Sequence, residues 1–282
     1  MKFFLVFTVT VMMMFAAACT ADNTGVEPND SNESANVSDE QAGSKTTETD
    51  KEKENEEEPG RPEKEEAITD EELRYTVRES DWTVQPVEEG KENQNVLITI
   101  DDAPDTYSLQ MAHTLKEKGV PAIFFVNGHF LQDEEGKNHL KEIYDMGFAI
   151  GNHTMNHVSL NNVSAEETRQ EIEQLNDLVE NITGEKPVFF RAPFGINTDE
   201  SKAVLEENEM IWMNWTYGYD WEEEYMEADA LTNIMVNTDL LVHGANLLMH
   251  DREWTKEALP HIIDGFKEKG YGFIHPDQID IN

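Results

Sequence analysis

The fold is decided by a series of short apolar segments, the first of which is Val96-Leu97-Ile98-Thr99-Ile100. Short runs rich in β-branched and aromatic residues are typical of buried strands. Six further runs follow, at residues 122–126, 148–150, 188–190, 211–215, 246–249 and 271–275. The sequence therefore predicts about seven strands within residues 96–282.

Helical patterns separate these runs, and the clearest extends from Ser164 to Asn181. Ser164 and Glu167 have the spacing of an N-terminal capping box, and Gly184 is a stop signal. Strands that alternate with helices predict an α/β fold with a parallel sheet. Because there are about seven strands and no glycine-rich dinucleotide loop follows the first, we expect an incomplete (β/α) barrel rather than a flat doubly wound sheet.

Residues 1–19 are expected to be a signal peptide, because Lys2 precedes an unbroken run of apolar or small residues. This run is shorter than the roughly 20 residues that cross a bilayer comfortably. Its end, Phe15-Ala16-Ala17-Ala18-Cys19, resembles a bacterial lipobox, in which Cys19 would carry a lipid anchor. Ordinary secretion after an Ala-x-Ala site is the alternative. We expect an exported bacterial protein, either held at the extracellular face of the cell membrane or secreted.

Residues 20–74 contain no aromatic side chain and consist largely of acidic, amide, hydroxyl and Lys residues. Such a composition cannot bury enough apolar surface to offset chain entropy, so it predicts a disordered acidic linker. Residues 75–95 are expected to be a short lead-in to the folded domain, which occupies residues 96–282.

The charge balance limits the partners of this chain. Its 282 residues include 59 acidic and 21 basic side chains, which give a formal net charge of −38. Binding to nucleic acid or to anionic lipid heads needs clustered Lys and Arg, so these partners are excluded. The single cysteine excludes an intrachain disulfide framework. We expect the protein to be a monomer.

Polar residues with useful chemistry follow most of the predicted strands. In a parallel barrel, the groups that follow the strands meet at one end, where active sites form. These groups are Asp101-Asp102 after the first strand, His153 and His157 after the third, Arg191 after the fourth, Asp220-Trp221 after the fifth and His250-Asp251 at the end of the sixth.

Two histidines four residues apart indicate a metal site only when another ligand accompanies them. Together with a carboxylate from another strand, His153 and His157 would supply two nitrogens and one oxygen, the ligand set of a catalytic divalent metal. The third ligand is one of Asp101 and Asp102, and the other carboxylate would accept a proton from water. Zinc is the first expectation for the ion, while cobalt, nickel, iron and manganese also suit this ligand set.

Five segments in order resemble the motifs of the polysaccharide deacetylases, also called carbohydrate esterase family 4 or the NodB-homology domain. The segments are Thr99-Ile100-Asp101-Asp102-Ala103-Pro104, His153-Thr154-Met155-Asn156-His157, Arg191-Ala192-Pro193-Phe194-Gly195, Asp220-Trp221 and Leu248-Met249-His250. The resemblance covers about residues 95–275. It implies a distorted (β/α) barrel that hydrolyses an N- or O-acetyl group on a glycan.

The resemblance also implies a role for each matching residue. Asp101 would be the general base, oriented by Arg191. The metal would be held by Asp102, His153 and His157. His250 would be the general acid, held and tuned by Asp220.

Further positions would form the substrate pocket. By the same resemblance, Trp221 and Leu248 would surround the acetyl methyl group. We expect the backbone N–H of Phe194 to help hold the oxyanion of the tetrahedral intermediate. Tyr217 stands where the family often has an aspartate. Because they follow the strand end, Tyr217 and Tyr219 are expected to contact a glycan.

Two other aromatic residues, Trp212 and Trp215, lie on a predicted buried strand and are expected to belong to the core.

These features together predict a metal-dependent deacetylase acting on cell-envelope glycan, most simply on peptidoglycan N-acetylhexosamine. One alternative is an esterase that removes O-acetyl groups from xylan-like polysaccharides, and another is a deacetylase of chitin or poly-N-acetylglucosamine. An alternative of a different class is a glycan-binding surface lipoprotein with little turnover.

Overall fold

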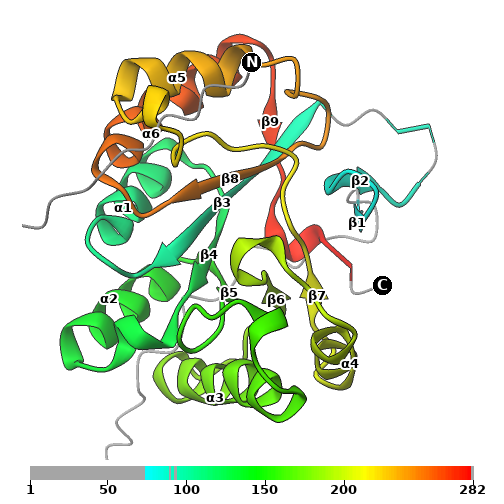
Figure 1. Ribbon diagram of the computed structural model, residues 1–282. Helices are drawn as coiled ribbons and strands as arrows, with labels where there is room; N and C mark the ends of the chain where they lie inside the picture. Colours follow the sequence, from blue (N-terminus) through cyan, green and yellow to red (C-terminus); the bar gives the residue numbers. More distant parts are fainter. Residues whose placement is uncertain (1–73, 89, 92–93, 281–282) are drawn as a thin grey trace, which may run out of the picture. The chain divides into compact units, whose positions relative to one another are not determined.

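The computed structural model describes residues 74–88, 90–91 and 94–280 (Figure 1). The predicted signal peptide, Cys19 and all of the predicted acidic linker except its last residue lie outside this part of the chain. Among the described residues, no helix combines the length and the apolar character needed to cross a membrane.

Seven parallel strands form one curled sheet with the order β7-β6-β5-β4-β3-β8, and β9 pairs with β3. Their bounds are β3 Asn95–Ala103, β4 Ala122–Val126, β5 Ala149–Asn152, β6 Phe189–Phe190, β7 Ile211–Trp212, β8 Asn246–His250 and β9 Gly272–Phe273. The predicted α/β class and the incomplete barrel of about seven parallel strands are confirmed.

The strand predicted over residues 211–215 is too long. After β7 the chain leaves the edge of the sheet and crosses to β8, where the Thr216 N–H donates to the Asn246 carbonyl at 2.8 Å. The Leu248 N–H in turn donates to the Tyr217 carbonyl at 2.9 Å. This crossing segment runs from β7, at one edge of the sheet, to β8, at the other edge. It therefore closes the curl without a further regular strand.

Within the described part of the chain, six α-helices lie on the outside of the curled sheet (Figure 1). Neighbouring helices pack in the order α5, α6, α1, α2, α3 and α4, which follows the order of the strands. Their bounds are α1 Ser108–Lys118, α2 Glu134–Asp145, α3 Ala165–Thr183, α4 Asp199–Glu207, α5 Ala228–Asn237 and α6 Glu253–Glu268.

The prediction for α3 is confirmed in detail. Its capping box is formed by Ser164 and Glu167, and its C-cap is Gly184 with φ of 92°. A positive φ costs glycine little, since it has no Cβ. The helix therefore ends where the sequence predicts.

Alternation along β3 positions the functional residues. Ile98 and Ile100 are fully buried and belong to the apolar cluster that includes helix residues, whereas Leu97 belongs to the cluster inside the curl. Because side chains alternate between the two faces of a strand, Thr99 and Asp101 share the inner face with Leu97. The curl thus directs a carboxylate inward at the carboxyl end of β3.

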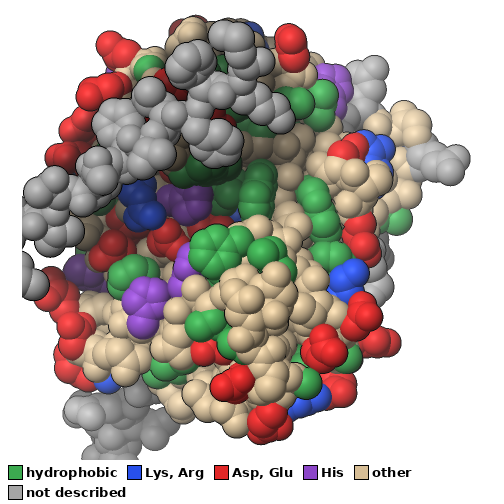
Figure 2. All heavy atoms as spheres, in the orientation of Figure 1, with side chains coloured by type: hydrophobic (Ala, Val, Ile, Leu, Met, Phe, Trp, Pro, Cys, Tyr) green, Lys and Arg blue, Asp and Glu red, His purple; other side chains and the backbone are tan. Residues whose placement is uncertain are grey.

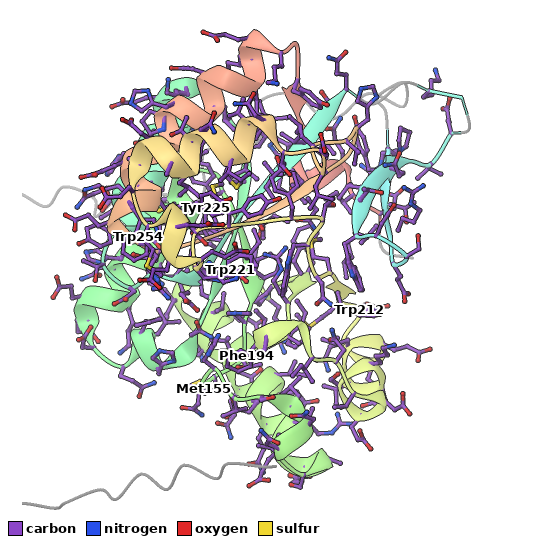
Figure 3. All side chains as sticks on the ribbon, turned by 45° about the horizontal axis from the view of Figure 1, so that its top comes forward. Met155, Phe194, Trp212, Trp221, Tyr225 and Trp254 are labelled. Atoms are coloured by element: carbon purple, nitrogen blue, oxygen red, sulfur yellow. The ribbon has the colours of Figure 1, made fainter. Side chains whose placement is uncertain are left out.

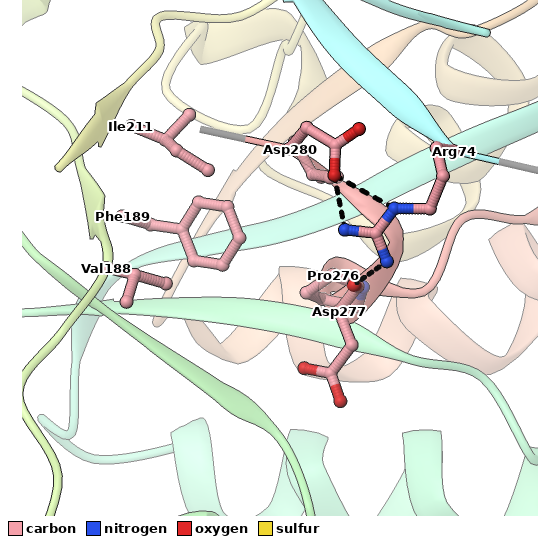
Figure 4. A pocket seen from close by; sticks show the side chains of 8 residues that line it. Arg74, Val188, Phe189, Ile211, Pro276, Asp277 and Asp280 are labelled. Carbon is pink, nitrogen blue, oxygen red and sulfur yellow. Dashed lines mark hydrogen bonds and ion pairs between the residues drawn. The ribbon is translucent and has the colours of Figure 1, made fainter. Parts of the chain in front are cut away.

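The predicted lead-in forms an antiparallel hairpin of β1 (Tyr75–Arg78) and β2 (Thr83–Pro86). Its buried residues Tyr75, Val77 and Val84 join the inner apolar cluster. At the amino ends of β6 and β7, a pocket of about 570 Å³ lies beside Arg74 (Figure 4). The Arg74 Nε donates to Asp280 Oδ1 at 2.9 Å, which joins the start of the described chain to its end.

Candidate active site

The residues predicted at the strand ends lie together at the carboxyl end of the curled sheet. Asp101 and His250 are register partners on the neighbouring strands β3 and β8. The His153 Nε2 lies 3.6 Å from Asp101 Oδ2, and the Arg191 Nη1 lies 2.6 Å from Asp101 Oδ1. Four segments far apart in the sequence therefore meet around Asp101.

Asp102, His153 and His157 form a group whose potential ligand atoms all lie within 4.8 Å of one another. The His153 Nδ1 is 2.7 Å from the Arg191 carbonyl oxygen, so it carries the proton and leaves the Nε2 lone pair available. Burial lowers the pKa of His153 despite the nearby carboxylates, which favours the neutral imidazole that binds metals. The donor set and its spacing fit a divalent metal ion.

The loop that carries both histidines is held by two buried amides. The Asn127 Nδ2 donates to the His153 carbonyl at 2.5 Å. The Asn152 Oδ1 accepts the Thr154 N–H at 2.8 Å, and its Nδ2 donates to the Ile172 carbonyl. These contacts tie the loop to the sheet and to α3.

Backbone strain is concentrated in the same place. Asp102, Thr154, His157 and Phe194 all have φ between 53° and 68°, a region that residues other than glycine seldom adopt. Each such residue costs on the order of 1–3 kcal/mol, which the surrounding contacts must offset. Strain of this kind clusters at functional sites.

Arg191 is fully buried beside Asp101. It donates to Asp101 Oδ1 at 2.6 Å and to Thr99 Oγ1 at 2.7 Å, and its guanidinium lies 4.3 Å from the centroid of the Phe125 ring. Burial lowers the pKa of Arg191 while the charge of Asp101 opposes this effect. The guanidinium remains charged in proteins, so it fixes the Asp101 carboxylate in one orientation.

His250 is held from the opposite side by Asp220. The His250 Nδ1 lies 2.7 Å from Asp220 Oδ1, and Oδ2 accepts the His250 N–H at 2.6 Å. Thr255 Oγ1 donates to the same Oδ2 at 2.8 Å. Burial alone would lower the pKa of His250, but the charge and hydrogen bond of Asp220, with Asp101 and Asp102, raise it above its ordinary value. A charged His250 with a free Nε2–H is suited to donate a proton.

Comparison with known proteins decides the family. The profile described as "Polysaccharide deacetylase" matches residues 88–211. A peptidoglycan-N-acetylglucosamine deacetylase of Bacillus cereus is 32% identical over 187 residues, which cover 64% of this chain and 66% of the relative. A second Bacillus cereus protein of that name is 30% identical over 194 residues, which cover 65% of this chain and 70% of the relative. The chain belongs to the polysaccharide deacetylase family.

The family fold does not by itself ensure activity. Wild-type BA3943 from Bacillus anthracis is a CE4 family pseudoenzyme, with 29% identity and a TM-score of 0.60 over 66% of this chain and 65% of that chain. A mutant of BA3943 with restored enzymatic activity has 31% identity and the same TM-score over 66% of this chain and 67% of that chain. The residues at the strand ends therefore need to be judged individually, because function depends on the site and not on the fold.

The match to the two Bacillus cereus deacetylases is partial in length, since the chain spans about two thirds of each of them. All five family motifs lie within the described residues and at one end of the sheet. The predicted enzyme class, a hydrolase of the polysaccharide deacetylase family, is confirmed by the family comparison.

Exposed aromatic side chains border the site of this polysaccharide deacetylase. The Phe194 ring is 63% exposed and meets the His157 ring edge to face at 5.0 Å. Trp221 is 43% exposed and packs against His250 at 5.5 Å. Leu248 is buried two residues before His250, on the same face of β8. Figure 3 shows Phe194 and Trp221, and Figure 2 shows acidic and histidine side chains in a hollow on this face.

The expected glycan contact of Tyr217 is wrong. Its side chain is only 2% exposed, and its hydroxyl donates to the Met235 carbonyl at 2.8 Å. Tyr217 belongs to the apolar core between the sheet and the helices, because the crossing segment directs its side chain toward α5. Tyr219 is half-buried between Tyr217 and Tyr225, and its hydroxyl contacts Thr238 Oγ1 at 2.7 Å.

The two tryptophans expected in the core are only half-buried. Trp212 packs against Trp82 of the lead-in, at 5.0 Å between ring centroids. Trp215 lies beyond β7, where its ring is 6.3 Å from that of Trp221. Trp215 therefore packs beside Trp221, one of the exposed aromatic residues at the site.

Sequence reasoning missed one charged residue of the site, Arg252. Its Nη2 donates to Asp102 Oδ2 at 3.0 Å. Burial of Asp102 would raise its pKa, but His250, His153, His157 and Arg252 together lower it, which keeps the carboxylate ionised. Arg252 follows His250-Asp251 by one position, and that neighbourhood was the only signal that could have drawn attention to it.

Proposed function

We propose that this protein is a metal-dependent hydrolase that removes N-acetyl groups from cell-envelope glycan. The observation that carries the proposal is the convergence of Asp101 and His250, as register partners, beside the group of Asp102, His153 and His157. A base and an acid from neighbouring strands thereby border a set of metal ligands. Binding of a glycan alone would not require this arrangement.

Asp102, His153 and His157 would hold one divalent ion, with zinc as the first choice and cobalt, nickel, iron or manganese as alternatives. When bound, the ion supplies Lewis-acid polarisation of the acetyl carbonyl and lowers the pKa of water to about 7. Three protein ligands are the usual number in catalytic sites, which keep positions open for water and substrate.

The residues of the chain provide the proton transfers. Asp101, oriented by Arg191, accepts a proton from the attacking water. His250, whose charged form is stabilised by Asp220, donates a proton to the nitrogen of the departing amine. An amine needs this proton, because its unprotonated anion is a poor leaving group. An ester depends less on it, so the Asp220–His250 pair favours an N-acetyl over an O-acetyl substrate.

Peptidoglycan N-acetylhexosamine is the proposed substrate for two reasons. The two Bacillus cereus relatives are named for deacetylation of the N-acetylglucosamine of peptidoglycan. Export and a lipid anchor at Cys19, both inferred from residues 1–19, would place the domain beside that polymer.

Acetate release from peptidoglycan, chitin oligomers and acetylxylan, measured with and without a chelator, tests the proposal. We expect release from peptidoglycan that chelator abolishes and added zinc restores. Release only from acetylxylan would identify an O-acetyl esterase, and faster release from chitin oligomers would identify a chitin-type deacetylase. Binding to peptidoglycan without any release would overturn the enzymatic proposal and favour a glycan-binding lipoprotein.

A further inference from the structure

Arg252 reaches from the start of α6 to a carboxylate on another strand. It is the N-cap residue of α6, two positions after His250. Its Nη2 donates to Asp102 Oδ2 at 3.0 Å, and its Nη1 donates to the Asp251 carbonyl at 3.1 Å. Its side chain is 39% exposed, so the guanidinium lies at the mouth of the site.

The two oxygens of Asp102 have different neighbours. Oδ1 lies 3.6 Å from Nε2 of His157, which belongs with Asp102 and His153 to the candidate ligand group. Oδ2 accepts the hydrogen bond from Arg252. A carboxylate can use both oxygens toward one cation, but here a second cation already occupies one of them.

We propose that Arg252 is a positioning residue that limits Asp102 to one oxygen toward the metal and shares its negative charge. The inference rests on the proposed metal site and extends it. Because the guanidinium is always charged, Arg252 also repels a divalent ion bound by the same carboxylate. The site therefore binds its ion less tightly than three ligands alone would, and coordination positions stay open for substrate.

The position of Arg252 is itself fixed by its neighbour. The Asp251 carboxylate accepts the Tyr107 N–H at 2.6 Å and the Ser108 N–H at 2.8 Å, at the start of α1. The Asp251 N–H donates to the Asp101 carbonyl at 3.1 Å. The end of β8 is thus tied to the end of β3, which keeps Arg252 within reach of Asp102.

Arg252→Ala, Arg252→Gln and Arg252→Lys in the full chain separate charge from hydrogen bonding. Zinc affinity is measured by competition with a chelating dye, and coordination is followed by the visible absorption of bound Co²⁺. We expect the Ala and Gln variants to bind zinc about tenfold more tightly, because both lack the positive charge that repels the ion. Arg252→Lys should bind zinc as the parent does.

The Co²⁺ spectrum reports whether Asp102 uses one oxygen or both toward the metal. In Arg252→Ala both oxygens of Asp102 become available, so the coordination number should rise and the visible bands should weaken. Arg252→Gln keeps an N–H donor and should retain the bands of the parent. Arg169→Ala is the matched control, since Arg169 forms exposed ion pairs with Glu173 and Glu207 away from the site.

Weaker or unchanged zinc binding by both Arg252→Ala and Arg252→Gln would overturn the inference, provided that circular dichroism shows both variants folded. If Arg252→Ala fails to fold, the Gln and Lys variants decide alone. Metal binding is measured without substrate, so failure of this inference differs from failure of the proposed function. A parent that binds zinc but releases no acetate would contradict only the latter, and a parent that binds no zinc would contradict both.

Discussion

Two arginine–aspartate pairs lie at opposite ends of the same sheet and differ in burial. Arg191 and Asp101 at the carboxyl ends of the strands have side chains that are 0% and 3% exposed. Arg74 and Asp280 at the amino ends are 40% and 39% exposed. The first pair lies beside strained backbone and the candidate metal ligands, and the second lies beside a pocket.

The difference in burial between the two pairs indicates that the buried pair serves the site rather than the stability of the fold. Burying two charges costs desolvation free energy that their attraction only partly offsets, so such a pair is a poor way to gain stability. The Arg191–Asp101 pair is better explained by its place in the site, where Arg191 fixes the orientation of the Asp101 carboxylate. The Arg74–Asp280 pair joins the two ends of the described chain, and its energetic contribution is expected to be small.

The largest effect is expected at the carboxyl ends from His153→Ala. This substitution removes one of the three ligands and leaves the Arg191 carbonyl without its partner. We expect bound metal and acetate release to be lost together, measured by elemental analysis and by an acetate assay. A variant that keeps stoichiometric metal would refute the assigned ligand group.

Asp101→Asn tests the buried pair directly. Loss of the base should reduce acetate release about 10²- to 10⁴-fold while the metal content stays near that of the parent. Because Arg191 then keeps its buried charge without a carboxylate, the free energy of unfolding should fall by about 3–5 kcal/mol in urea titrations. Turnover equal to that of the parent would remove Asp101 from the role of base.

Asp220→Asn should change the pH dependence rather than the fold of the site. The pKa of His250 is raised above its ordinary value chiefly through Asp220, against the opposing effect of burial. Removal of the charge should lower that pKa, so the alkaline limb of kcat/KM for acetate release should move to lower pH. An alkaline limb at the same pH in both proteins would show that another group titrates there.

The same shift has a consequence for stability. A group with a raised pKa in the folded state stabilises the fold below its unfolded pKa, and this contribution disappears as the pH rises through the folded pKa. Above neutral pH, the difference in the free energy of unfolding between the parent and Asp220→Asn should therefore become smaller. Urea titrations of both proteins at several pH values would measure this loss.

Asp280→Asn is the matched substitution at the amino ends and should have the smallest effect. The pair with Arg74 is solvent-exposed, so we expect a change of about 0–1 kcal/mol in the free energy of unfolding. Metal content and acetate release should equal those of the parent. A loss of activity here would show that the amino end of the sheet influences the site, and the two ends would then differ less than their burial suggests.

Much of the fold could be predicted because its signals are local. Seven apolar runs marked the strands, and a capping box with a terminal glycine marked α3 within one or two residues. Strand ends at one edge of a parallel sheet then explained why Asp101, His153 and His250 meet. The length of β7 could not be predicted, because the chain leaves the sheet there to bond with β8.

The surroundings of the site were less predictable. Tyr217 follows a strand end and has the sequence context of a surface aromatic residue, yet the crossing segment buries it beneath α5. Asn127 supports the histidine loop from just after β4, and nothing near it in the sequence indicates that contact. Arg252 meets Asp102 across 150 positions of the chain.

The amino-acid sequence by itself determined the order of strands and helices and the chemical types that follow each strand. Both are local properties, written in apolar periodicity and in the residues at segment ends. Only the tertiary structure decided which oxygen of Asp102 lies near His157 and which meets Arg252, and which aromatic rings remain exposed. Those outcomes depend on contacts between distant segments, whose geometry is set when the sheet curls and the helices pack around it.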